Sequence, residues 1–255
     1  MTEAGQLFLV GVFVYLAAGA VKGLLGIGLP TLAVGLMAQF VEAREAITLV
    51  IMPMIAANAW QVLRSGPPVA VVRRSWASCR ALAVSMLLVL GLVALVAPQV
   101  PERLVTAVLG TVVTLFAATS LWRQPPPLPA RLDLPAQLAA GTIAGVLGGI
   151  SGIWAPPVIV YLSTRRLGPA AFVETTGVLL FAGSVVLGLG YAASGLLTAD
   201  LAARSAAMIP AAITGYAFGE RYRHGLSGPR FRTLVLGFFL LMGLNLVRRA
   251  LSGTA

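Results

Sequence analysis

The sequence predicts an all-α membrane protein made of two inverted-topology repeats of four segments each, in which the first segment of each repeat is a broken or re-entrant helix. Composition, the length of the apolar runs and a repeated glycine pattern support this fold class. Of the 255 residues, 58% are hydrophobic and only 10% are charged, whereas an average soluble domain has about 25% charged residues. So few charges cannot cover a soluble protein of this size, and we expect a multi-pass protein in a lipid bilayer.

The charge balance bears on the partners and cofactors of the protein. The chain has 18 Lys and Arg against 8 Asp and Glu, a net charge of +10, which in a soluble protein would suggest nucleic-acid binding. Here the basic residues lie mostly between apolar runs, where they set membrane topology, so we expect no nucleic-acid partner. Cys79 and His224 are the only residues of their kinds. Without a Cys/His cluster we expect no metal and no cofactor.

Eight apolar runs follow one another along the chain, and most have the length of an ordinary transmembrane helix, about 20 residues. They cover residues 6–40, 46–63, 81–97, 104–122, 134–164, 172–193, 201–219 and 234–247. The run 134–164 contains no charge and would measure about 46 Å as one helix, against a hydrocarbon core of about 30 Å. It is too long for one crossing and too short for two, so we expect a broken or re-entrant hairpin there and in the run 6–40.

Glycine and proline mark the two expected breaks. Residues 18–30 have the sequence AGAVKGLLGIGLP, and residues 140–157 have the sequence AGTIAGVLGGISGIWAPP. At a constant offset of 122, Gly19, Gly23 and Gly26 match Gly141, Gly145 and Gly148. The pattern predicts a first transmembrane repeat over 1–122, a stiff Pro-rich linker over 123–134 and a second transmembrane repeat over 135–255.

The arginines predict the topology of these repeats. If the runs 6–40 and 134–164 return to the side from which they enter, each half crosses the membrane three times and the second half is inverted. Twelve arginines then lie on one side and five on the other. The positive-inside rule places the larger group in the cytoplasm and both termini outside it. Arg248 and Arg249, at an outside C-terminus, fit this arrangement least well.

Inverted repeats with discontinuous helices are typical of transporters, whose substrate sites lie at the broken ends near the membrane midplane. Two breaks facing each other would form one cavity, and their free N–H groups and helix N-termini would favour an anion. Lys22, the only lysine, lies within the first break. A lysine there is costly unless it faces a cavity. The alternatives are a Lys22 that snorkels to the headgroups and glycines that only pack helices.

The candidate anion-binding residues combine the two breaks with polar side chains of the neighbouring runs. Amides and hydroxyls can donate to oxyanions, but they also join membrane helices to one another, and this structural role stays open for each. The candidates are Lys22, Gly26, Gly28, Asn58, Gln61, Gly149, Ser151, Gly152, Trp154, Thr175 and Thr176. Glu174 is either a proton-coupling carboxylate or, as we favour, an acid near a helix N-terminus.

The two glycine patterns resemble the repeated glycine-rich signature of the sulfite exporter TauE/SafE family. The matching residues are Gly19, Gly23, Gly26, Gly28 and Pro30, then Gly141, Gly145, Gly148, Gly149, Gly152 and Pro156. The resemblance covers nearly the whole chain and implies an inverted-repeat bundle in the bacterial inner membrane. It also implies transport of sulfur-containing anions such as sulfite, thiosulfate, sulfolactate or sulfoacetate. The first half lacks a full triple-glycine run, which leaves the substrate more open than the fold.

We therefore expect a secondary transporter that exports small organic or inorganic sulfur anions by alternating access. A carrier or channel for other small anions, such as carboxylates, is the alternative. The expected partners are the anionic substrate and the bilayer, and the sequence leaves open whether the protein is a homodimer. We do not expect an enzyme, because no cluster of His, Asp and Glu or other catalytic motif is present. We do not favour a cation carrier, which would need a buried carboxylate. We also do not favour an interaction subunit, in which the paired breaks would be superfluous.

Overall fold

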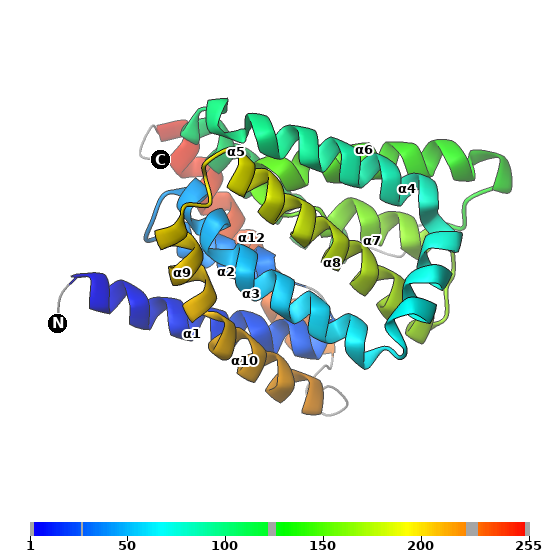
Figure 1. Cartoon of the computed structure of the whole chain (residues 1–255), viewed down its shortest axis with the longest axis horizontal. Coiled ribbons are helices and arrows are strands. Elements are labelled where there is room, and N and C mark those ends of the chain that lie inside the picture. The colour runs from blue at the N-terminus through cyan, green and yellow to red at the C-terminus, as the bar shows by residue number, and fades with distance from the viewer. Residues whose placement is uncertain (1–2, 27, 122–125, 223–228, 253–255) are drawn as a thin grey trace. The chain divides into compact units, whose positions relative to one another are not determined.

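The computed structural model of the chain describes residues 3–26, 28–121, 126–222 and 229–252. Over these residues the protein is helical and has no β-strand (Figure 1), which confirms the predicted all-α class. His224 and part of the predicted linker 123–134 lie outside the described residues.

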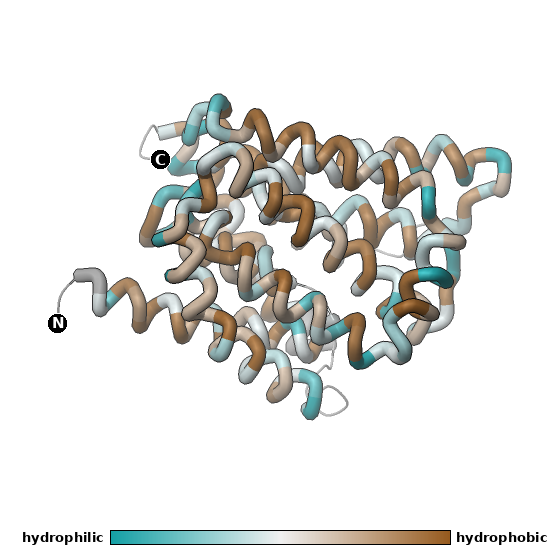
Figure 2. The backbone as a smooth tube through the Cα atoms, in the orientation of Figure 1, coloured by the Kyte–Doolittle hydropathy of each residue, from teal (hydrophilic) through white to brown (hydrophobic). Residues whose placement is uncertain are grey.

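Within the described ranges, seven helices are long and apolar enough to cross a membrane. They are α1 (Glu3–Leu25), α3 (Ala43–Arg64), α4 (Pro68–Val96), α5 (Glu102–Leu121), α6 (Asp133–Ser151), α8 (Pro169–Ala193) and α12 (Pro229–Ser252). The shorter α-helices are α2 (Leu29–Met37), α7 (Ala155–Thr164), α9 (Ala199–Ala207) and α10 (Ile209–Arg221). Figure 2 shows hydrophobic residues along the length of α4 and α8 and hydrophilic residues near helix ends, as expected for helices in lipid.

Both runs that were predicted to be broken are broken. The run 6–40 forms α1 and the short α2, and the run 134–164 forms α6 and the short α7. The short helix packs against the long one in both cases. Gly28 (φ +103°) and Gly152 (φ +69°) have a left-handed backbone at the breaks, which glycine adopts without the steric cost of a side chain.

The two breaks do not lie at the same place relative to the repeated glycines. The break positions are 126 residues apart, from Gly26 to Gly152 and from Pro30 to Pro156, whereas the glycine pattern repeats at 122. Gly148, which the pattern pairs with Gly26, stays inside α6. Relative to the repeated glycines, the second long helix therefore continues for about one more turn before it breaks.

The run 201–219 differs from the single transmembrane helix that was expected. It is split at Met208 into α9 and α10, and Pro210 lies in the first turn of α10. Proline has no N–H to donate and its ring collides with the carbonyl four residues before it, which ends α9. The protein therefore has a third interrupted segment in addition to the two that were predicted.

The helix α4 begins at Pro68, well before the apolar run 81–97, and takes in several arginines. It bends at Cys79, whose φ of −148° and ψ of 37° are not helical. Just beyond the bend, the Leu82 N–H donates to Gln137 Oε1 on α6 at 3.3 Å. A side chain that enters the helical hydrogen-bond ladder in this way is a common cause of a kink.

Contacts between helices divide the chain into two compact units. Unit 1 consists of Met1–Ala57, Val100–Trp122 and Leu197–Ala255, and unit 2 consists of Asn58–Gln99 and Arg123–Leu196. In unit 1, α1 packs on α10 and α5 packs on α12; in unit 2, α6 and α8 pack on α4. Each half of the sequence therefore supplies helices to both units, so the compact units differ from the division into 1–122 and 135–255.

Repeated glycines allow these helices to approach closely. In unit 1, a Cβ atom on Gly19 or Gly23 would collide with the backbone of α10. In unit 2, a Cβ atom on Gly145 would lie 2.7 Å from Val89 Cβ on α4. These glycines have the small-residue packing role that the sequence left open, and it is the glycines that follow them which form the breaks.

Candidate functional site

In unit 1, Lys22 lies just before the first break, and the N-terminus of α2 lies just after it. Lys22 lies in the last turn of α1 and is only 1% exposed. Its Nζ atom lies 5.9 Å from the centroid of the Tyr216 ring on α10, a distance at which a cation is attracted to the ring face. The Lys22 side chain is therefore enclosed by protein, unlike a lysine that extends to the lipid headgroups.

The helix α2 begins inside the protein without a capping side chain. Gly28 is its N-cap residue and supplies no side-chain hydrogen bond, and Pro30 follows. Almost the whole of α2, from Leu29 to Val34 and beyond, is buried. The first N–H groups of a helix have no partner within it and carry the positive end of its dipole, so this terminus is suited to an anion.

The second break, in unit 2, has the same construction. Gly152 ends α6, and α7 begins after Trp154 with prolines in its first turn and no capping side chain. Ser151 Oγ donates to the Leu147 carbonyl at 2.7 Å and accepts from the N–H of Ile153 at 3.4 Å. Its hydroxyl thus bridges the end of α6 and the break, and both sides of the break are buried.

Trp154 carries a buried donor that is not satisfied. Its side chain is 1% exposed, and a Cβ atom on Gly183 of α8 would lie 2.7 Å from its Nε1 atom. Among the described residues this N–H has no hydrogen-bond partner. A buried indole N–H normally has a partner, so Trp154 is a candidate donor to a ligand.

The helix α8 collects four of the predicted polar residues within unit 2. Asn58 Nδ2 donates to the Leu180 carbonyl at 3.1 Å, and Gln61 Nε2 donates to the Val173 carbonyl at 3.2 Å. Thr175 and Thr176 lie on α8 itself and are buried. Asn58 and Gln61 share a face, as their spacing predicts, and these two bonds join the end of α3 to α8.

Thr176 differs from the two amides, because its buried Oγ1 atom has no partner in the described part of the chain. Gly149, in contrast, packs closely against a neighbouring helix. A Cβ atom there would lie 2.6 Å from Val93 Cβ on α4, and the Gly149 carbonyl accepts from Tyr191 Oη at 3.2 Å. The structure thus gives Gly149 a packing role.

Glu174 is held by an arginine. Arg74 Nε and Nη2 donate to its two carboxylate oxygens at 3.0 and 2.9 Å. This bidentate pair joins the second turns of α4 and α8. An ion pair of this kind occupies both oxygens of the carboxylate.

Tyr15 was missed by the sequence analysis. It is 1% exposed, and its hydroxyl has no hydrogen-bond partner among the described residues. It lines a cavity of 320 Å³ in unit 1 together with Glu45 and Arg204. Tyr15 lies seven residues before Lys22 and therefore on the same face of α1, and this spacing was the available signal.

Comparison with known proteins matches residues 11–246 to the family described as sulfite exporter TauE/SafE. No match was found among curated proteins or solved structures. The match extends over both breaks. The chain is a multi-pass membrane protein that belongs to the sulfite exporter TauE/SafE family.

Proposed function

We propose that the protein is a secondary transporter that exports small sulfur-containing anions, such as sulfite or sulfoacetate, across the bacterial inner membrane by alternating access. Membership of a sulfite exporter family supports the membrane transport of sulfur anions. The observation that carries the anion assignment is that two helices, α2 and α7, begin at buried breaks without a capping side chain. Uncapped helix N-termini inside a membrane protein favour negative groups.

The residues near the breaks supply the chemistry that an oxyanion needs. Lys22 offers a positive charge beside the break of unit 1. In unit 2, Trp154 Nε1 and Thr176 Oγ1 are buried donors without a partner among the described residues. Sulfite and sulfonates present several oxygens, which accept hydrogen bonds from N–H and O–H groups. The remaining predicted site residues would shape these positions. They are Gly26, Gly28, Asn58, Gln61, Gly149, Ser151, Gly152 and Thr175.

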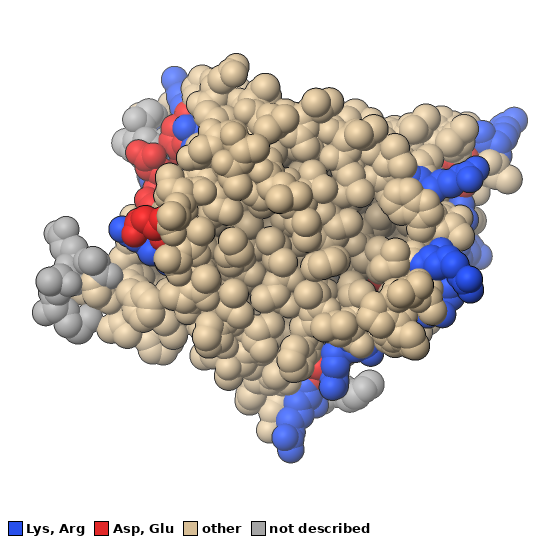
Figure 3. All heavy atoms as spheres, in the orientation of Figure 1, with Lys and Arg blue, Asp and Glu red and all other residues tan. Residues whose placement is uncertain are grey.

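We further propose that the two sequence repeats have inverted topology. The ion pair Arg74–Glu174 joins the second turns of α4 and α8. The ion pair Arg165–Asp133 joins the end of α7 to the first turn of α6. Figure 3 shows Lys and Arg gathered at the end of unit 2 where α4 begins, and an uncharged surface along its helices. The positive-inside rule supports a cytoplasmic location for this end.

Transport of other small anions, such as carboxylates, is the alternative function. Helix N-termini and a lysine attract a carboxylate as well as a sulfonate. The discriminating feature is the number of acceptor oxygens, because a sulfonate has three and a carboxylate has two. A site with more donors than a carboxylate can satisfy would leave buried donors unpaired, which costs binding energy.

Proteoliposomes test the proposal directly. Purified protein is reconstituted, and the movement of radiolabelled sulfite, sulfoacetate and acetate is measured. We expect sulfite or sulfoacetate to move and acetate to move slowly. Lys22→Gln should raise the KM by about tenfold or more, because hydrogen bonds to charged groups contribute about 1.5–3 kcal/mol. Arg73→Gln, an exposed arginine of α4, is the matched control and should transport like the wild type.

Three outcomes would contradict the proposal or a part of it. If none of the anions moves in vesicles that contain folded protein, the protein is not an anion transporter. If acetate moves as fast as the sulfur anions, the alternative is correct. If Lys22→Gln folds, inserts and transports with an unchanged KM, then Lys22 has no part in binding.

A further inference from the structure

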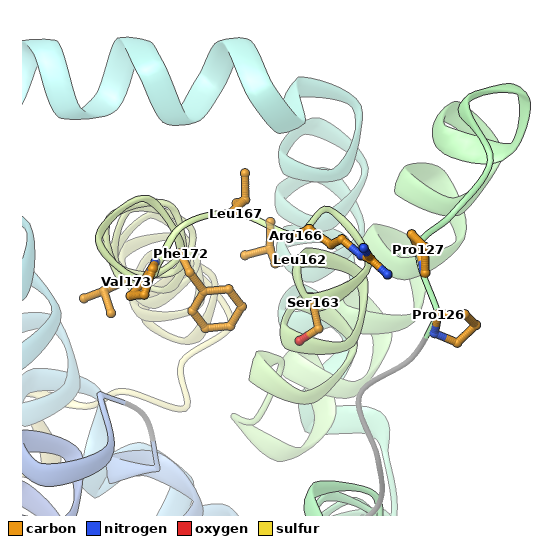
Figure 4. Close-up of a pocket in the computed structure, with 9 residues that line it drawn as sticks. Pro126, Pro127, Leu162, Ser163, Arg166, Leu167, Phe172 and Val173 are labelled. Carbon is orange, nitrogen blue, oxygen red and sulfur yellow. The ribbon is translucent and has the colours of Figure 1, made fainter.

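A cavity of 780 Å³ lies in unit 2 between the Pro-rich linker and the loop that joins α7 to α8. Apolar side chains line one part of it, with Pro127 on the linker, Leu162 on α7 and Phe172 on α8, and polar atoms line about half of it. Arg166 is the only charged residue among the described residues that line it. Figure 4 shows the Arg166 side chain extending toward Pro127, with Ser163 below it and Phe172 nearer to α8.

The backbone of Arg166 has an unusual conformation. Its φ of +48° is left-handed, and it is the only such residue other than glycine in the described chain. It follows the end of α7, a position where glycine is usual. A side chain in this conformation costs about 1–2 kcal/mol. Strain of this size at a loop residue points to a role for the side chain.

The charge of Arg166 is not neutralised by the parts of the protein that the structure describes. Neighbouring Arg165 donates to Asp133, and Tyr161 Oη also donates to Asp133, at 2.9 Å. The hydrogen bond to Asp133 raises the pKa of Arg165, so this pair stays ionised and cancels. Arg166 forms no hydrogen bond or ion pair with a described residue, and it is exposed.

We propose that this cavity binds one anionic phospholipid, with the phosphate at Arg166 and an acyl chain along Leu162, Phe172 and Val173. A cavity that combines a cationic residue with several apolar side chains matches a ligand with an anionic head and an apolar tail. Basic pockets beside transmembrane helices are suited to such headgroups. An inorganic anion would satisfy Arg166 but would leave the apolar side chains of the cavity without a partner. This inference does not depend on the transported substrate.

Nanodiscs test the lipid site. The protein is placed in nanodiscs of phosphatidylcholine alone or mixed with phosphatidylglycerol, and retained lipid is counted by native mass spectrometry. Wild-type protein should retain phosphatidylglycerol and unfold at a higher temperature in the mixture. Arg166→Asn removes the charge but tolerates the left-handed backbone. It should bind phosphatidylglycerol about fivefold more weakly, since a basic residue near the surface contributes about 1 kcal/mol.

Controls separate this site from general surface charge. Arg166→Lys should keep most of the binding, and Arg73→Gln, at the same basic end but outside the cavity, should behave like the wild type. Arg166→Gly should unfold at a higher temperature than the wild type in phosphatidylcholine, because it relieves the backbone strain. It should also lose the added stability that phosphatidylglycerol provides.

The inference is overturned if Arg166→Asn retains phosphatidylglycerol as well as the wild type does, or if Arg73→Gln loses it equally. It is also overturned if inorganic phosphate stabilises the wild type in phosphatidylcholine as much as phosphatidylglycerol does. In that case the cavity binds a free anion. None of these readouts requires transport, so a failed transport assay would leave them interpretable.

Discussion

At the scale of single residues, the predicted site divides into residues that hold the protein together and residues that are left with an unused donor. Asn58 and Gln61 use their amides to bind carbonyls of α8. Trp154 and Thr176 have no such partner in the described chain. An unsatisfied buried donor costs stability, so it is retained most readily where a ligand completes it.

Trp154→Phe should raise the KM for sulfite or sulfoacetate without lowering stability. The substitution keeps an aromatic ring against Gly183 and removes the N–H that has no partner. A hydrogen bond to an anion contributes about 1.5–3 kcal/mol to binding, so its loss should raise the KM by about tenfold or more. Transport kinetics and thermal unfolding of the same preparation measure both effects.

Gly183→Ala is the structural control for this prediction. Its new methyl group would press on the indole, since a Cβ atom would lie 2.7 Å from Trp154 Nε1. Overpacking of this kind costs about 1–3 kcal/mol, so the unfolding temperature should fall. If Trp154→Phe lowers the unfolding temperature as much and leaves the KM unchanged, Trp154 only packs.

At the scale of elements, the interruptions were predictable wherever glycine or proline marks them. The sequence located both breaks because the charge-free run 134–164 is too long for one crossing and too short for two, and its glycine pattern recurs in the run 6–40. It missed the split at Met208, although Pro210 was visible, because the run has the length of one ordinary span. The bend at Cys79 had no local signal, since the Gln137 side chain that accompanies it comes from another helix.

The proline inside α3 shows how a contact with another helix satisfies backbone groups that a proline leaves unpaired. Pro53 lies inside α3 and has no N–H to donate to the Leu49 carbonyl. Ser205 of α9 donates to that carbonyl at 2.7 Å and accepts from the N–H of Met52 at 3.1 Å. Ser205 is fully buried, so one hydroxyl satisfies two backbone groups of a neighbouring helix.

Ser205→Ala should therefore lower the free energy of unfolding by about 1–3 kcal/mol, the cost of leaving buried polar groups unpaired. Thermal unfolding in detergent measures the effect. Ser78→Ala is the matched control, because the Ser78 hydroxyl donates to the Ser75 carbonyl within its own helix, and its unfolding temperature should change little. An equal shift for both variants would show that the bonds to Leu49 and Met52 are not important for stability.

At the scale of the whole molecule, membrane class and family were predictable because composition and repeated glycines are properties of the sequence alone. The helices that make up each compact unit were not predictable from the sequence. Their grouping depends on which glycine-lined helices meet, and α1 packs on α10 from the far end of the chain. The glycine patterns of the two halves form small-residue surfaces of the same kind. The local sequence therefore does not determine which helix packs on which.

Topology is the remaining prediction at this scale, and single cysteines can test it. Cys79 is buried and is the only cysteine, so Cys79→Ser gives a cysteine-free background. In that background, Ser252→Cys reports on the C-terminal end of α12 and Arg73→Cys on the basic end of α4; both residues are exposed. On intact cells, a membrane-impermeant maleimide should label Ser252→Cys, while Arg73→Cys should be labelled only after the membrane is opened.

The reason for this asymmetry is the excess of arginines on the side of Arg73, because basic residues are retained in the cytoplasm. It also depends on the short helices α2 and α7 returning toward the side from which α1 and α6 enter. If both long runs crossed fully instead, the linker would lie outside and the halves would be parallel. Labelling of Arg73→Cys on intact cells, or protection of Ser252→Cys, would therefore contradict the inverted repeats while leaving the breaks themselves in place.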